Sequence, residues 1–126
     1  MERPWIPDPA GGLGGTADIS CVPCGTYQLV LHDTVDHPKT FALVNPELGV
    51  YHEPRDIPPM VIGRSTCLIH AFNWVWQSLG CTGVGMGCQQ NNLTWMLTNS
   101  REALAEFLGA VPWVEGHTIS IVEATT

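Results

Sequence analysis

The sequence is poor in basic residues. Five lysines and arginines stand against twelve aspartates and glutamates, so the formal net charge is −7. The basic residues are also scattered along the chain, whereas proteins that bind the phosphate backbone of DNA or RNA normally carry a basic patch. The composition therefore disfavours direct binding of nucleic acid.

Long apolar segments are absent as well. No stretch approaches the roughly 18 apolar residues that a membrane span requires, and the first residues lack the apolar run of a signal peptide. We therefore expect a cytoplasmic protein without a transmembrane segment. In a chain without an export signal, the odd number of five cysteines disfavours a disulfide framework, and it favours free thiols or metal ligation.

The sequence does contain many apolar residues that can form a hydrophobic core. Apolar residues make up 44% of the 126 residues and charged residues 13%, which suits one domain of ordinary size with a single core. Prolines and glycines crowd residues 4–15, and this composition predicts a flexible lead-in over residues 1–20. Residues 21–126 are predicted to form a single α+β domain.

Alternating apolar residues, bounded by turn residues, predict the strands. The first three are expected to form an antiparallel meander, because polar turns connect them. A proline-rich connector then leads to a brief edge strand, and period-two alternation near the end of the chain predicts a last strand. The predicted strands are 26–32, 40–44, 50–52, 60–62 and 117–123.

The strongest predicted helix covers residues 66–79. Ser65 offers an N-cap, and Gly80 stands where helices favour glycine. Apolar residues occupy most of its circumference, as in a central helix that packs against a sheet. A short helix is predicted over 91–97 and a second clear one over 101–108, with Asn99 or Ser100 as its cap.

Cys67 is the most suggestive residue for chemistry. At the second position of a helix, unpaired backbone N–H groups and the helix dipole lower the pKa of a thiol and favour the nucleophilic thiolate. A nucleophilic cysteine also needs a histidine base, and His37, His52 and His32 are candidates. The alternative is a buried structural cysteine, which is the commonest fate of cysteine among apolar neighbours.

A second group of cysteines suggests a metal. Cys21 and Cys24 have the spacing of a zinc half-site, and Cys81 and Cys88 could complete it. Two incidental thiols in a turn remain an alternative. A redox pair is disfavoured because a strand, and not a helix, follows the CxxC motif. No nucleotide-binding fingerprint follows the glycine-rich loop 80–87, so no cofactor is predicted.

Three segments, in this order, resemble a known motif series. The segments are His37-Pro38-Lys39-Thr40-Phe41-Ala42-Leu43-Val44, Gly49-Val50-Tyr51-His52 and Thr66-Cys67-Leu68-Ile69-His70-Ala71-Phe72. They resemble the H-box and NC motifs of lecithin retinol acyltransferase-like proteins, their H-rev107 relatives and picornaviral 2A proteins of the H-box/NC type (kobuvirus-like), all related to the NlpC/P60 class. The resemblance covers about half of the chain, from Gly25 to Leu79.

The resemblance implies a fold and a set of site residues. The fold is a permuted papain-like domain, with an antiparallel sheet packed on a central helix starting near Cys67. Cys67 matches the nucleophile, His37 the general base and His52 the orienting histidine. The chain departs from the motifs at Pro38-Lys39 after the first histidine, and at Thr66, where the family has asparagine. These departures favour a protein without enzymatic activity.

The function that the resemblance implies is that of a viral nonstructural 2A-type protein. Such a protein acts in viral RNA replication through contacts with host and viral replication proteins and is not a protease. Its expected location is the host cytoplasm, with peripheral contact to replication membranes as a further expectation. Two alternatives stay open: an active Cys-His thiol acyltransferase or phospholipase-like hydrolase, and a zinc-stapled interaction module.

Overall fold

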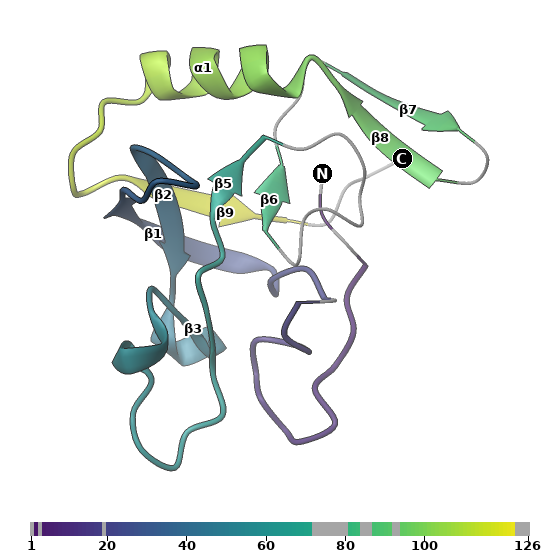
Figure 1. Ribbon diagram of the computed structural model, residues 1–126. Helices are drawn as coiled ribbons and strands as arrows, with labels where there is room; N and C mark the ends of the chain where they lie inside the picture. Colours follow the sequence, from purple (N-terminus) through teal and green to yellow (C-terminus); the bar gives the residue numbers. More distant parts are fainter. Residues whose placement is uncertain are drawn as a thin grey trace.

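The computed structural model describes residues 2, 4–18, 20–71, 81–83, 87–91 and 94–122, and Figure 1 shows their arrangement. The fold is mixed α+β, with one α-helix and several small sheets in this part of the chain. The strands are β1 (Gly25–His32), β2 (Thr40–Val44), β3 (Val50–Tyr51), β4 (Arg64–Ser65), β5 (Ile69–His70), β6 (Thr82–Gly83), β7 (Gly87–Asn91), β8 (Thr94–Thr98) and β9 (Thr118–Ile121). The helix α1 covers Ser100–Ala110, and short 3-10 helices cover Pro46–Leu48 and Pro54–Asp56.

The largest sheet has the strand order β2-β1-β9, and both pairings are antiparallel. His32 of β1 lies opposite Thr40 of β2, and Gly25 lies opposite Ile121 of β9. These strands confirm the predictions for 26–32, 40–44 and 117–123. The helix predicted over 101–108 is also confirmed, and it extends slightly further at both ends as α1.

The predicted meander is wrong at its third strand. β3 forms, but it pairs in parallel with β4 and does not join the sheet of β1 and β2 as a strand. An isolated antiparallel bridge links Val50 to Asn45, the residue after β2. The turn between β2 and β3 explains the change of direction, because Asn45 caps a short 3-10 helix and Gly49 adopts a left-handed backbone with φ 73°. The edge strand predicted at 60–62 is also wrong, since these residues are exposed and Met60 has a positive φ of 69°.

The helix predicted to start near Cys67 is wrong over its first residues. The backbone is extended there: Leu43 N–H donates to Cys67 O over 2.8 Å, and Leu68 forms a bridge to Ala42 of β2. β5 follows and pairs in parallel with β6. A short apolar run suits a fully buried strand as well as a buried helix, and here β2 supplies the hydrogen-bonding partner. Residues 72–79 of the predicted helix lie outside the described residues.

The short helix predicted over 91–97 is wrong too. β7 and β8 form an antiparallel pair in which Gly87 lies opposite Thr98 and Asn91 opposite Thr94. β8 contains Thr94, Trp95 and Thr98, and threonine and tryptophan are favoured in strands. Among the described residues no helix is long and apolar enough to cross a membrane.

The lead-in segment lies against β4 through a buried arginine. The guanidinium of Arg64 donates to the carbonyl oxygens of Gly14 over 2.9 Å, Ser20 over 3.0 Å and Cys21 over 3.1 Å. The described residues of this segment form no helix or strand, as its prolines and glycines predict. Hydrogen bonds from Arg64, rather than strand pairing, therefore connect this segment to the domain.

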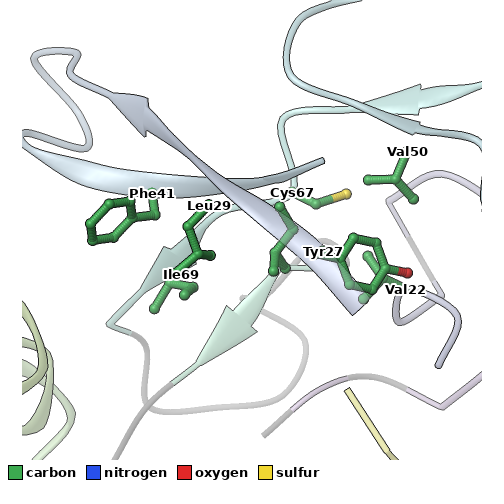
Figure 2. Close-up of a cluster of buried hydrophobic side chains, with 8 residues drawn as sticks. Val22, Tyr27, Leu29, Phe41, Val50, Cys67 and Ile69 are labelled. Carbon is green, nitrogen blue, oxygen red and sulfur yellow. The ribbon is translucent and has the colours of Figure 1, made fainter. Parts of the chain in front are cut away.

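The core is built from side chains of β1, β2 and β3 and of the segment that carries Cys67, which runs beside β2 (Figure 2). α1 covers one end of this core, because Phe107 packs edge to face against Phe41 with ring centroids 6.4 Å apart. After the helix, Trp113 Nε1–H donates to Thr40 O over 2.8 Å. The buried cluster consists of Val22, Tyr27, Leu29, Phe41, Leu43, Val50, Cys67 and Ile69.

Candidate functional site

Cys67 lies in the core rather than at a surface. Its side chain is 2% exposed, and Figure 2 shows its sulfur pointing toward Val50 within the apolar cluster. The hydrogen bond of the thiol goes to a backbone carbonyl, Ser65 O, at 3.9 Å. The position therefore matches the structural cysteine that the sequence left open as the alternative.

The chemistry of this thiol follows from its burial. Loss of solvent raises the pKa of Cys67 to about 11, and the nearby positive charge of Arg64 offsets only part of that effect. The sequence predicted a lowered pKa from a helix N-terminus, and this prediction is wrong because the backbone around Cys67 is extended. The thiol is protonated at neutral pH.

The four histidines near the first two strands form two pairs. His32 Nδ1 lies 3.0 Å from His52 Nε2, and the rings of His37 and His70 meet edge to face with centroids 5.0 Å apart. Within the described residues, no hydrogen bond joins the thiol of Cys67 to His37 or His52. The structure thus brings each predicted histidine to another histidine, and the catalytic role of Cys67, His37 and His52 stays a prediction.

The His32–His52 contact makes stability sensitive to pH. One ring nitrogen must donate and the other accept, so the contact requires at least one neutral ring. Burial lowers the pKa of His32, and His52 and His37 lower it further, whereas Glu53 and Asp33 act in the opposite direction. A lowered folded-state pKa means that the unfolded chain binds more protons in this pH range.

We expect the contribution of His32 to the free energy of unfolding to be constant above about pH 6.5, the ordinary pKa of histidine, and to be lost as pH drops from there through the lowered folded-state value. Urea denaturation at a series of pH values measures this dependence. The His32→Asn variant keeps a polar side chain that does not titrate, so its stability should vary less over the same range. An unchanged pH dependence in this variant would contradict the assignment.

Within the described residues, the thiols other than Cys67 form no metal site. Cys81 Sγ accepts from Leu68 N–H over 3.3 Å, and burial raises the pKa of this thiol. Burial also raises the pKa of Cys21, whereas Cys24 is exposed. Cys88 lies in β7. No group of three or more histidine, cysteine, aspartate or glutamate side chains in the described part of the chain could hold a metal ion, so the zinc hypothesis gains no geometric support.

A cavity of about 370 Å³ lies between α1, the turn after β1 and the end of β5. Arg101, Leu104, Ala105 and Leu108 line it from one face of α1, and His37 and His70 are among the residues that line the rest. Sequence reasoning missed this cavity. The helical spacing of the four α1 residues identifies one helix face, but only the fold shows that the histidine pair lies beside it.

The described residues thus include a buried protonated thiol, two histidine pairs and an open cavity that Cys67 does not line. A Cys-His nucleophile requires the base within hydrogen-bonding reach of the sulfur, and the described contacts do not assemble one. Comparison with models of protein families, with curated proteins and with solved structures finds no match for this chain.

Proposed function

We propose that this chain is a nonstructural protein of the picornaviral 2A class of the H-box/NC type, and that it acts in viral RNA replication through contacts with host and viral proteins. In this proposal it is neither a protease nor an active acyltransferase. It works in the host cytoplasm, at or near replication membranes. The proposed fold is a permuted papain-like domain. It keeps the motif residues but not their catalytic activity.

One observation carries the choice of a contact function over an enzymatic one. Cys67 is 2% exposed, and burial raises the pKa of its thiol to about 11. A thiol nucleophile reacts as the thiolate and needs access to substrate. Acyl transfer through a thioester would require both a lower pKa of the Cys67 thiol and an open path to its sulfur. The geometry therefore favours the members of the proposed family that are not enzymes.

The arrangement of the motif segments supports the proposed relationship in a more limited way. His37 lies in the turn between β1 and β2, and β2 continues from it as the predicted H-box strand. The Cys67 segment hydrogen-bonds to that same strand through Leu43 N–H. The first and third motif segments are therefore adjacent in space.

Thiol alkylation tests the enzymatic alternative directly. At pH 7.5 we expect iodoacetamide to modify Cys67 at least about tenfold more slowly than the exposed Cys24, because the thiolate is scarce and the sulfur is buried. Mass spectrometry of the digested protein gives both rates within one sample. His37→Ala should leave the Cys67 rate unchanged. Faster labelling of Cys67 than of Cys24, with loss of this rate in His37→Ala, would overturn the proposal in favour of an acyltransferase.

A replicon experiment tests the function itself. Cys67→Ala introduced into a viral replicon should leave RNA synthesis close to that of the unchanged sequence, because the proposal gives the sulfur no chemical role. Deleting the codons for residues 25–122 should reduce RNA synthesis sharply. Full RNA synthesis after the deletion would overturn the role in replication, and loss of synthesis in Cys67→Ala with a normally folded protein would restore the enzymatic alternative.

A further inference from the structure

The cavity beside α1 has an apolar floor. Leu104, Ala105 and Leu108 line it at positions that follow one another on one face of the helix. Across from α1, the turn after β1 contributes Pro38, and Ala71 follows β5. With a volume of about 370 Å³, the cavity is near the lower end of the ~300–1,000 Å³ typical of small-molecule sites. It therefore suits a compact ligand rather than a long chain.

A positively charged side chain lies beside these apolar residues. Arg101 lines the cavity one helical turn before Leu104 and Ala105. In the described part of the chain it makes no salt bridge and no side-chain hydrogen bond, and although Asp36 also lines the cavity, the two do not pair. Arg101 is therefore available to a ligand.

The other described basic side chains are already engaged. The guanidinium of Arg64 binds backbone carbonyls, Arg55 Nε lies 2.6 Å from a carboxylate oxygen of Glu53, and Lys39 Nζ lies 6.0 Å from the ring centroid of Trp113. In a chain with a net charge of −7, an unpaired arginine beside an apolar cavity is the most favourable place for an anion among the described residues.

We propose that this cavity binds a compact apolar anion, an aromatic or branched carboxylate or sulfonate of one to three rings in size. Its body packs on Leu104 and Leu108, and its charged group lies at Arg101. His37, which lines the cavity across from α1, carries a further ring N–H donor. The inference rests on α1 and the turn after β1, and it is independent of the proposed role in replication.

Two dyes that differ by one charge test the site. 8-Anilinonaphthalene-1-sulfonate carries a sulfonate, and N-phenyl-1-naphthylamine has the same ring system without it. Fluorescence titration should give one strong site for the sulfonate on the full chain. Arg101→Gln should weaken its binding at least about tenfold, the lower end of what a hydrogen bond to a charged group contributes, and leave the uncharged dye unaffected. Ala105→Phe should fill the cavity and abolish binding of both dyes.

Neutralisation of a negative charge in the same cavity lining provides the control. Asp36→Asn removes the exposed carboxylate that repels an anion, so it should tighten binding of the sulfonate. Arg55→Gln removes a cation that is remote from the cavity lining and should change nothing. Circular dichroism verifies that each variant folds. Equal loss in Arg101→Gln and Arg55→Gln, or sulfonate binding that survives Ala105→Phe, would overturn the proposal.

Discussion

Arg64→Ala is expected to lower the free energy of unfolding by about 3 kcal/mol, because the substitution leaves several buried carbonyl oxygens without a donor. Arg64 is 5% exposed, and its guanidinium reaches Gly14 O, Ser20 O and Cys21 O. Gly14 and Ser20 are themselves buried, so water does not replace the lost donors readily. Urea denaturation followed by tryptophan fluorescence measures the change.

Arg55→Ala is the matched control for this experiment. Its side chain is 82% exposed and pairs with Glu53 at the surface, so the expected change is below about 0.5 kcal/mol. Limited proteolysis gives a second readout, since Arg64→Ala should expose the segment 4–18 to cleavage while Arg55→Ala should not. Equal stability of the two variants would mean that the hydrogen bonds of Arg64 contribute nothing net to folding.

Phe41→Ala is expected to cost about 3–5 kcal/mol, the range for removing a large buried aromatic side chain. Phe41 is fully buried as the second residue of β2. Its ring meets Phe107 of α1 and also His117, with centroids 6.0 Å apart in the second pair. The substitution therefore opens a cavity in the core and removes the contact that holds α1 on the sheet. Thermal and urea denaturation both report this loss.

Two further variants test whether the loss of stability comes from packing at Phe41 or from the removal of any apolar side chain. Phe41→Leu keeps an apolar side chain of similar reach and should cost less than Phe41→Ala, about 1–2 kcal/mol. Val35→Ala, at a side chain that is 99% exposed, should be neutral within about 0.5 kcal/mol. A Phe41→Ala protein as stable as Val35→Ala would contradict the packing between α1 and β2.

The elements that the sequence predicted correctly are those with strong local signals. β1 and β2 alternate or run apolar between polar turns, and α1 starts after Asn99 with helix-forming residues throughout. The segment from Cys67 to His70 has no such signal, because an apolar run fits a buried helix and a buried strand equally. The hydrogen bonds from β2 decide the outcome, and their partner lies more than twenty residues away in the chain.

In the candidate site, too, only the features with a local signal could be predicted from the sequence. Cys67 and the histidines could be named from the sequence, but their pairing depends on how β1, β2, β3 and β5 approach one another. The pKa prediction for Cys67 failed with its helix, because a dipole requires ordered N–H groups and an extended backbone offers none. Once the residue is buried among apolar side chains, desolvation governs its pKa.

The pairing of β1 with β9 has a consequence for how the protein is made. Residues 25–28 find their partners only at residues 118–121 (Figure 1), so the ribosome must release most of the described chain before this pair can close. Until then, one edge of the β1–β2 hairpin is open to other strands. Contacts of such long sequence separation also slow folding. A nascent chain therefore passes through a period in which this edge is vulnerable to aggregation, and a holding chaperone would act most effectively there.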